Sequence, residues 1–317
     1  MQRSRIVLLA VAAFALVSSA AAHSIAATTL PVPWRILLAS DREGDTDIYR
    51  VDADGRRSVR LTRSPRFDAP SAVSPDGRRI LFESNRSPKG DVWVMNGDGT
   101  GQRNLTRSPA FECCGSWSPD GRRIAFVSDR DGNDEIYVMN QDGGAQHVVA
   151  ASPSSQEIPA AWSPDGSSIA FATDRDGNWE IYAMDADGDN PRNLTRNALS
   201  EGRDGGFAWS PDGRRIVFAT NRDRSRSRAG KVQDELWVMN ADGSGQQRLT
   251  RSPEAEQVIT WSPDGRKIVF LRDLTNLGIP DRQVTVMNTD GTGAHSISSP
   301  GLHAVPSWQA RGVPLGG

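Results

Sequence analysis

The ten residues Trp117–Phe126, WSPDGRRIAF, decide the fold because they recur along the chain. They return as WSPDGSSIAF from Trp162, WSPDGRRIVF from Trp209 and WSPDGRKIVF from Trp261, and as VSPDGRRILF from Val73. The tetrapeptide SPDG begins, with periods of 44, 45, 47 and 52 residues, at Ser74, Ser118, Ser163, Ser210 and Ser262. Periods in this range indicate a repeat architecture.

The letters of the repeat predict three turns per unit. Ser, Pro, Asp and Gly suit the four places of a type I turn, because Pro sets φ at the second place and Gly is tolerated at the fourth. A strand and a second apolar run, such as EIYVMN from Glu135, follow each SPDG. Asp-Gly pairs then mark a second hairpin, at Asp54, Asp98, Asp142, Asp187, Asp242 and Asp290. A third turn through Leu-Thr leads to the next Trp, so each unit is a four-stranded antiparallel meander.

The second apolar run predicts how these sheets assemble. Ile136, Tyr137, Val138 and Met139 are successive apolar residues, so both faces of their sheet must be covered. Four-stranded sheets stacked face to face around an axis meet this requirement, and that arrangement is a β-propeller. The alternative of an open β-solenoid would need shorter units. We therefore predict an all-β fold.

The ends of the chain give the number of blades. WRILLAS from Trp34 matches the strand after an SPDG, and HAVPSWQ from His303 matches the strand before one. These two halves complete a sixth blade. We expect a six-bladed β-propeller of four-stranded antiparallel blades, closed into a ring where residues 303–309 pair with residues 35–40.

The N-terminus predicts export. Arg3 and Arg5 precede an apolar run from Ile6 to Val17 and the sequence SSAAAH, as in a secretory signal peptide. This run is shorter than the roughly 20 residues that span a bilayer, and no later segment is longer, so we expect no transmembrane segment. The expected divisions are signal peptide 1–22, with cleavage after Ala22 or Ala27, linker 23–33, propeller 34–309 and tail 310–317. We expect a periplasmic or secreted monomer.

Charge and motifs exclude two classes of function. The formal net charge is −2, and it becomes −4 once residues 1–22, with two Arg and no acid, are removed. This balance argues against a nucleic-acid partner. The chain contains no G-x-S-x-G elbow, H-E-x-x-H helix, Walker loop or dinucleotide fingerprint. Catalysis by a familiar motif is therefore not expected.

The stretch WSPDGRRIAFVSDRDGNDEIYVMNQDG, residues 117–143, resembles the propeller repeats of the TolB family, also described as WD-repeat-like propellers. The resemblance covers about residues 34–309. TolB itself, as the resemblance implies, is a periplasmic partner of outer-membrane lipoproteins with an α/β domain ahead of its propeller. Only about a dozen residues separate the signal peptide from Trp34, so the resemblance covers the propeller repeats without that α/β domain.

The residue five positions before each repeat Trp, or before Val73 at the equivalent place, is ionisable. The resemblance implies that the Trp strand is innermost, which places these groups at one mouth of the central channel, and they are Asp68, Glu112, Glu157, Asp204, Glu256 and His303. A ring of like charges needs a partner, because two charges about 4 Å apart interact by about 4 kcal/mol at an effective dielectric of 20. The functional interpretation is a ligand site for a cation or a basic partner, and carboxylate oxygens would suit calcium or magnesium. The structural interpretation is that each acid accepts hydrogen bonds from the neighbouring blade.

A second recurrence predicts structural ion pairs. Arg42, Arg86, Arg130, Arg175 and Arg222 follow the second strand of their blades, and Asp47, Asp91, Glu135, Glu180 and Glu235 come a few residues later. An Arg and a carboxylate at a hairpin can pair across the two strands. We therefore expect each Arg to pair with the later acid.

Two units carry insertions between the second and third strands, NRDRSRSRAGKVQDE from Asn221 and LRDLTNLGIPDRQ from Leu271. In a meander this connection lies on the same side as the start of the first strand. The acidic mouth and both long loops should therefore share a face, the candidate partner site. Its candidate partner loop contains Arg222, Arg224, Arg226, Arg228 and Lys231. A solvated loop tip is the alternative interpretation of this basic stretch.

The remaining conspicuous residues are sulfur and indole side chains. Cys113 and Cys114 follow Glu112 directly and are a candidate vicinal disulfide, with packed or free thiols as the alternative. The five repeat Trp residues are most simply explained as blade-packing residues: Trp117, Trp162, Trp209, Trp261 and Trp308.

These observations favour a non-catalytic binding module for a protein or cell-envelope ligand. The alternative is a metal-dependent lyase or hydrolase with a divalent cation at the channel mouth.

Overall fold

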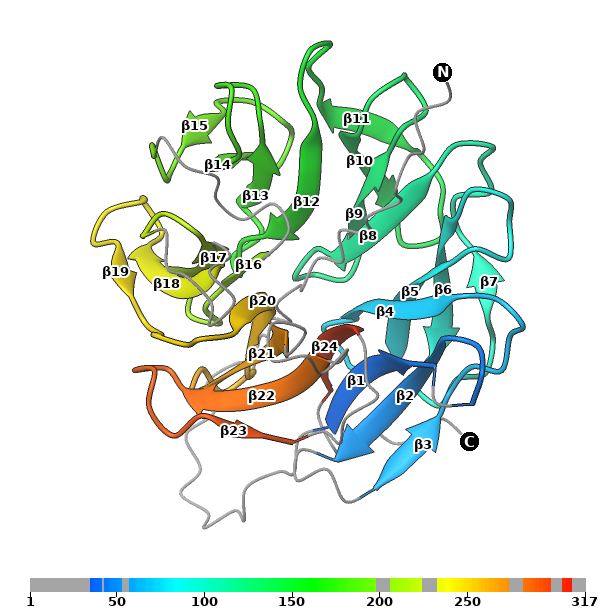
Figure 1. The fold of residues 1–317 in the computed structure, drawn as a ribbon. Helices are drawn as coiled ribbons and strands as arrows, with labels where there is room; N and C mark the ends of the chain where they lie inside the picture. The colour runs from blue at the N-terminus through cyan, green and yellow to red at the C-terminus, as the bar shows by residue number, and fades with distance from the viewer. Residues whose placement is uncertain are drawn as a thin grey trace, which may run out of the picture.

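The computed structural model describes residues 35–41, 43–52, 57–197, 206–223, 233–273, 282–297 and 304–309. Within these ranges every regular element is a β-strand, and the strands form six four-stranded antiparallel sheets. The sheets surround a central axis (Figure 1). The predicted six-bladed β-propeller is confirmed. The predicted signal peptide, linker and tail lie outside the described residues, and within them no helix is long and apolar enough to cross a membrane.

The first, innermost strands of the blades contact one another around the axis (Figure 1). They are β24 (Ala304–Gln309) in the first blade, then β4 (Asp68–Val73), β8 (Glu112–Trp117), β12 (Glu157–Trp162), β16 (Phe207–Trp209) and β20 (Ala255–Trp261). The second strands pair with them in the same blade order, as β1 (Arg35–Ser40), β5 (Arg79–Ser84), β9 (Arg123–Ser128), β13 (Ser168–Thr173), β17 (Arg215–Thr220) and β21 (Lys267–Asp273).

The third and fourth strands complete each blade toward the outside. The third strands are β2 (Asp47–Asp52), β6 (Asp91–Asn96), β10 (Glu135–Asn140), β14 (Glu180–Asp185), β18 (Glu235–Asn240) and β22 (Arg282–Asn288). The fourth strands are β3 (Ser58–Arg60), β7 (Arg103–Asn104), β11 (His147–Ala150), β15 (Arg192–Asn193), β19 (Gln247–Arg248) and β23 (His295–Ser296). The outer strands are short, which limits the exposed sheet edge.

SPDG forms the predicted hairpin between first and second strands. In the third blade the Gly121 amide donates to the Ser118 carbonyl at 2.9 Å, which closes the turn. The Ser118 hydroxyl donates to Asp120 Oδ1 at 2.6 Å and accepts the Arg123 amide at 2.9 Å. Gly121 has φ of +69°, a conformation that disfavours a side chain. The repeated SPDG tetrapeptide therefore supplies the hydrogen bonds and the backbone conformation of one turn.

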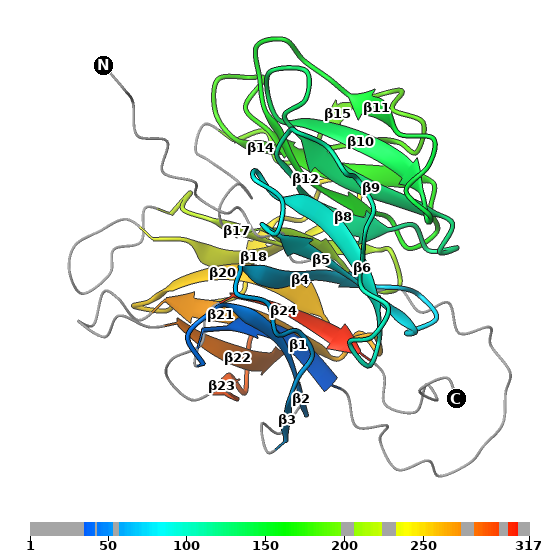
Figure 2. The ribbon, with the colours of Figure 1, turned by 90° about the vertical axis from the view of Figure 1, so that its right-hand side faces the viewer.

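The chain ends meet in the first blade, whose sheet has the order β24-β1-β2-β3. Arg35 lies opposite Gln309 and Ile36 opposite Trp308, in antiparallel register. Figure 2 shows β24 beside β1, with β4 of the second blade on its other side. The last strand of the chain thus supplies the innermost strand of the first blade.

Apolar side chains fill the space between blades. Trp117, Trp162, Trp209 and Trp261 are at most 7% exposed, which confirms their predicted packing role, and the side chain of Trp308 lies outside the described residues. Contacts with the preceding blade hold these rings: Arg79 lies over the Trp117 ring at 4.7 Å from its centroid. Ile136, Tyr137, Val138 and Met139 are all buried, so both faces of this sheet are covered as predicted.

Candidate functional site

One face of the propeller carries the connections between second and third strands and the segments that lead into the first strands. We call it the loop face; the SPDG and Asp-Gly turns lie on the opposite, turn face. Hydrogen bonds tie the two kinds of segment together, because Asp129, which follows β9, accepts the Phe111 amide before β8 at 2.7 Å. Asp174 accepts the Gln156 amide at 2.8 Å in the same way. The loop face is therefore the predicted channel-mouth face.

The four predicted ring acids that the structure describes are buried. Asp68, Glu157 and Glu256 are 0% exposed and Glu112 is 1% exposed. Asp204 and His303 lie outside the described residues. Each described carboxylate begins, or lies near the start of, an innermost strand and meets an Arg of its own blade.

These Arg side chains come from the end of the second strand, or just after it. Arg86 lies 2.5 Å from Asp68, Arg175 lies 3.2 Å from Glu157, and Arg272 lies 3.0 Å from Glu256. Arg130 pairs with Glu112 in the same manner. The ion-pair partner is thus an Arg of the same blade. The donors from the neighbouring blade that the structural interpretation expected are present as well at two of the acids, because Thr62 bonds to Asp68 and Thr250 bonds to Glu256.

Aromatic rings hold each Arg in place. The Arg130 guanidinium lies 4.5 Å from the Tyr137 ring centroid and 5.7 Å from that of Phe126. It also donates to Gln146 Oε1 at 2.9 Å. A planar guanidinium can stack on rings while it donates to a carboxylate, which a Lys ammonium does less well. The pair therefore fixes the loop that follows the second strand.

Burial shifts the titration of two of these acids. It is the largest influence on Asp68 and raises the pKa of that carboxyl above its ordinary value, although hydrogen bonds from Ser84 and Arg86 act in the opposite direction. Burial likewise raises the pKa of Glu256, against the effects of Thr250 and Arg272. Desolvation disfavours the charged form of a carboxyl, so the Arg partners offset only part of this cost.

The predicted pairing with the later acid is wrong for Arg86, Arg130 and Arg175, which pair with acids of the first strand, whereas Arg42 lies outside the described residues. Asp91, for example, accepts hydrogen bonds from Thr106 Oγ1 at 2.9 Å, Asn104 Nδ2 at 2.7 Å and the Ser108 amide at 3.2 Å. These donors lie in and beyond the fourth strand. The Arg instead lies over the rings of the second and third strands and reaches the acid of the first strand, as Arg130 reaches Glu112.

Arg222, predicted in the basic partner loop, has the position of the repeated Arg in the fifth blade. It lies 4.6 Å from the Trp237 ring centroid and 5.2 Å from that of Phe218. The other members of the predicted partner loop, Arg224, Arg226, Arg228 and Lys231, lie outside the described residues. Their contribution to binding stays a prediction.

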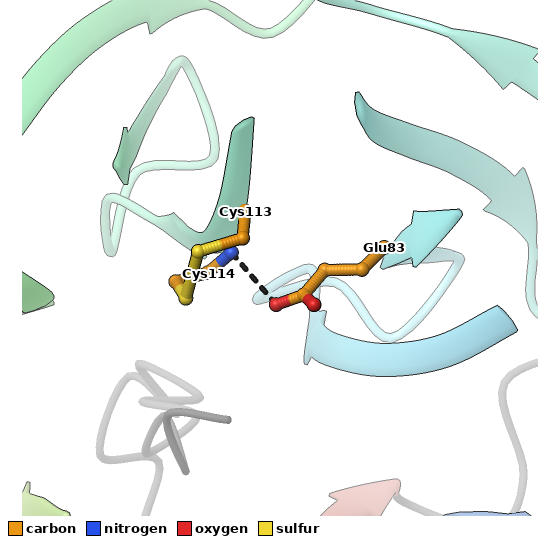
Figure 3. Close-up of side chains that lie close together, drawn as sticks. All are labelled: Glu83, Cys113 and Cys114. Carbon is orange, nitrogen blue, oxygen red and sulfur yellow. Dashed lines mark hydrogen bonds between the residues drawn. A yellow bond between two sulfur atoms is a disulfide. The ribbon is translucent and has the colours of Figure 1, made fainter. Parts of the chain in front are cut away.

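Cys113 and Cys114 are joined in a disulfide, one of the two alternatives that the sequence left open. They lie on β8, where the pairing with β9 is shifted by a bulge between Cys113 and Ser116. The Cys114 amide donates to Glu83 Oε1 at 2.9 Å (Figure 3). Glu83 extends from β5 of the second blade, so this contact crosses a blade interface.

Glu83 is not among the residues predicted from the sequence. The signal was present, because the same position of the other five second strands is apolar: Ala39, Val127, Ala172, Ala219 and Leu271. Glu83 is 4% exposed, and burial raises its pKa to about 7 while the Cys114 amide acts against this shift. An acid at an apolar register position is visible once the strands are aligned by SPDG.

Among the described residues, Glu83, Cys113 and Cys114 are the only group of three metal-ligating residue types whose ligand atoms lie close together. The metal-binding form of Cys is the thiolate, and here the two sulfurs are bonded to each other. The predicted calcium or magnesium site and the metal-dependent alternative stay predictions, since Asp204 and His303 lie outside the described ranges.

An open cleft of about 470 Å³ lies at the junction of the first and second blades. Its lining includes Arg63, Arg86 and Gln102, together with the Leu61–Pro65 segment and Gly99. Arg86 is already engaged with Asp68 and Gln102. The exposed residues of this lining are Arg63 and Pro65.

Fold and site together define a six-bladed β-propeller whose loop face is supported by buried carboxylates paired with partly buried Arg side chains. A family model described as TolB beta propeller domain matches residues 98–315, more than half of the chain. The chain belongs to the TolB β-propeller family. No curated protein matches it at a significant level.

Solved structures agree with this assignment. The chain is 25% identical to a TolB protein from Agrobacterium tumefaciens, with a TM-score of 0.65 over 87% of this chain and 92% of that one. TolB from Acinetobacter baumannii is 20% identical, with a TM-score of 0.71 over 87% of this chain and 66% of that one. A puromycin-hydrolysing peptidase from Mycobacterium tuberculosis is 17% identical, with a TM-score of 0.60, and the match covers 88% of this chain and 45% of that one. The last two likenesses show a shared fold.

Proposed function

We propose that the protein is a periplasmic or secreted, non-catalytic binding module that holds a protein or cell-envelope ligand on its loop face. Membership of the TolB β-propeller family supports a binding role. The signal sequence predicted in residues 1–22 supports the location. Loops on a rigid scaffold are where binding residues concentrate in β-proteins.

One observation carries this proposal: the loop face has exposed charged side chains in loops that hydrogen bonds and ion pairs hold in place. Asp131 and Asp176 are exposed at equivalent places in the third and fourth blades. The hydroxyls of Tyr137 and Tyr182 donate to them. Beneath each tip an Arg–carboxylate pair fixes the same loop. A partner would meet side chains whose positions are set before binding, which lowers the entropic cost of association.

The charges on this face have both signs. Exposed acids lie in the loops, at Glu43, Asp45, Asp131, Asp176 and Asp223. Exposed Arg residues lie in the segments that lead into the first strands, at Arg63, Arg107, Arg196 and Arg251. A polyanion would be repelled by the first set, whereas a folded protein can complement both. We therefore favour a protein partner.

The predicted ring residues have a supporting role in this proposal. Asp68, Glu112, Glu157 and Glu256 are buried and would hold the loops rather than touch the partner. Asp204, His303 and the basic residues of the fifth-blade insertion are still expected to contribute from the same face.

A crosslinking experiment tests the proposal. A photoreactive amino acid would replace Asp131 or Asp176 in the exported protein, and crosslinks would be made in the intact cell envelope. The control positions are Asp142 and Asp187, which are exposed in Asp-Gly turns of the same two blades. Their neighbours Gln141 and Ala186 are hydrogen bonded to the SPDG loops, which places them on the turn face.

We expect a discrete adduct with one protein from the loop-face positions and none from the turn-face controls. Equal adducts from both faces, or none from the loop face in cells that export the protein, would refute the proposed binding face.

A further inference from the structure

The disulfide between Cys113 and Cys114 cannot act as a structural staple. A disulfide stabilises a fold mainly by closing a loop in the unfolded chain, and its contribution grows with the length of that loop. Here the two Cys residues are adjacent, with a sequence separation of 1, so the disulfide closes almost no loop in the unfolded chain. The two Cα atoms are 3.8 Å apart, as adjacent residues are across any trans peptide bond, so the disulfide ties together no distant parts of the fold.

Backbone conformation at this place is also unusual. Cys114 has φ of +63°, in the left-handed region that residues with a side chain seldom adopt. It lies within the β8 bulge, which the innermost strands of the second, fourth and sixth blades share, but among the described residues of these bulges only Cys114 has a positive φ. Non-glycine residues held in this region concentrate at functional sites, because surrounding structure must maintain them.

Two departures from the repeat meet at one point. Glu83 replaces an apolar residue that the other five blades keep in the second strand, and the Cys pair occurs in one innermost strand only. The carboxylate oxygen and the two sulfur atoms lie within 4.8 Å of one another, although they come from adjacent blades. Figure 3 shows the Glu83 side chain directed toward the Cys pair. Comparison with the other blades therefore shows that two residue choices found only once in the repeat lie next to each other.

We propose that Cys113 and Cys114 form a thiol–disulfide exchange site, reduced by a dithiol donor, with Glu83 as the proton donor and acceptor for the Cys114 sulfur. Glu83 accepts the Cys114 amide at 2.9 Å, which holds its carboxyl beside that residue. Because the proton donor is held beside Cys114, Cys114 is the leaving sulfur and the attack falls on the Cys113 sulfur; the two residues are 5% and 1% exposed.

The exchange balances as follows. A thiolate of the donor attacks Cys113 Sγ, the bond to Cys114 Sγ breaks, and the Cys114 sulfur takes the proton of the Glu83 carboxyl. The second donor thiol gives its proton to the Glu83 carboxylate and attacks the donor sulfur of the mixed disulfide. Cys113 leaves as a thiolate and takes a proton from water. The donor is oxidised to a disulfide by two electrons, and the Cys pair is reduced by the same two.

The electrostatic setting suits this role. Burial raises the pKa of Glu83 to about 7, so both its acid and its base form exist near neutral pH. The other acids on the packed strands β4, β6 and β8 are Asp68, Asp91 and Glu112. Each has its own partners, Arg86, Thr106 and Arg130 respectively.

The experiment uses the mature protein, folded and in its oxidised state, with dithiothreitol as the donor. Thiols formed over time are trapped with iodoacetamide and counted by mass spectrometry. We expect two alkyl groups per chain without denaturant, and roughly a hundredfold slower reduction of Glu83→Gln, the effect of removing a positioned proton donor. The ratio of the two rates should fall as pH rises through 7, because the wild-type carboxyl then loses its proton.

Two matched variants separate chemistry from folding. Glu83→Ala installs the residue of the first, fourth and fifth blades and should fold, yet be reduced as slowly as Glu83→Gln. Cys113→Ala/Cys114→Ala should take up no label and melt within about 3 °C of the wild type. A disulfide that is reduced only in denaturant, or a much larger loss of melting temperature in the double variant, would overturn the exchange site. Equal reduction rates for wild type and Glu83→Gln would overturn the role of Glu83.

Discussion

Glu112 and Glu83 both carry buried carboxyl groups, but the two carboxyl groups have different hydrogen-bond and ion-pair partners. Glu112 faces Arg130 and the Ser128 hydroxyl within its own blade. Glu83 faces the amide of Cys114 from the next blade, and burial dominates its titration. A first-strand acid recurs in the second, third, fourth and sixth blades, whereas the acid of Glu83 occurs once. The comparison teaches that a repeated buried acid comes with a repeated partner, and that a single one without a cation indicates a local function.

Replacing Arg130, the cation that pairs with Glu112, should have the largest effect on the free energy of unfolding. Arg130→Met leaves Glu112 buried and without its cation, which makes it resemble Glu83. We expect a loss of about 3 kcal/mol in the free energy of unfolding, because an uncompensated buried charge is strongly destabilising. Urea denaturation at pH 7 measures this loss.

The control for this prediction is Arg130→Met/Glu112→Gln, in which no charge is left behind. It should recover most of the lost stability. If the double variant were as unstable as the single one, packing of the Arg130 stem and not charge compensation would explain the site.

The titration of Glu83 can be measured through the pH dependence of the free energy of unfolding. The folded pKa of Glu83 is about 7, above the ordinary value of 4.5, so its acid form is favoured by folding. The stabilisation is complete below pH 4.5 and is lost as pH rises through 7, which amounts to about 3 kcal/mol. Glu83→Ala should remove this slope, so the stability of the variant relative to the wild type should rise by that amount between pH 4.5 and 8.

Val127, the residue of the third blade at the position of Glu83, supplies the control. Val127→Ala should lose a constant amount of stability at every pH, because it removes packing and no titrating group. The two difference curves come from urea titrations at matched pH values. Parallel curves for the two variants would contradict the assigned titration.

The exposed carboxylate of Asp131 on the loop face accepts a hydrogen bond whose loss should have a smaller effect on stability. The Tyr137 hydroxyl donates to Asp131, and burial followed by this hydrogen bond raises the pKa of Tyr137. Tyr137→Phe should cost about 1 kcal/mol, the usual contribution of one hydrogen bond. Tyr182→Phe should act alike and additively, since the two lie in different blades. Thermal unfolding of both variants and their combination checks this, and strong coupling between them would contradict independent loops.

Most of the fold could be predicted from the sequence because turn chemistry is local. SPDG needs only its own Ser hydroxyl and Asp carboxylate to close the hairpin, as Ser118 and Asp120 do. The count of six blades followed from the unmatched strands at the two ends, which pair as β1 and β24. These features depend on neighbouring residues or on strand order, and both can be read from the sequence.

The site could be predicted only in part because its pairs depend on side-chain reach in three dimensions. Arg130 had two acids within range, and the stacking on Tyr137 that directs it to Glu112 is not a sequence pattern. Glu83 and Cys114 are 31 residues apart and belong to different blades. Alignment of the repeats reveals that both are exceptional, but only the packing of β5 against β8 brings them together.

The smallest expected change in stability is at the exposed tip of the loop face. Asp131→Asn removes the charge but keeps an oxygen that can accept the Tyr137 hydroxyl, so the melting curve should match the wild type within about 0.5 kcal/mol. Binding should respond differently, because a charge at an interface sets partner recognition and association rate. We expect Asp131→Asn/Asp176→Asn to lower recovery of the envelope partner at least severalfold, and Asp142→Asn/Asp187→Asn on the turn face to leave it unchanged. Quantitative pull-down at two salt concentrations measures both, and the difference should shrink at high salt as screening increases.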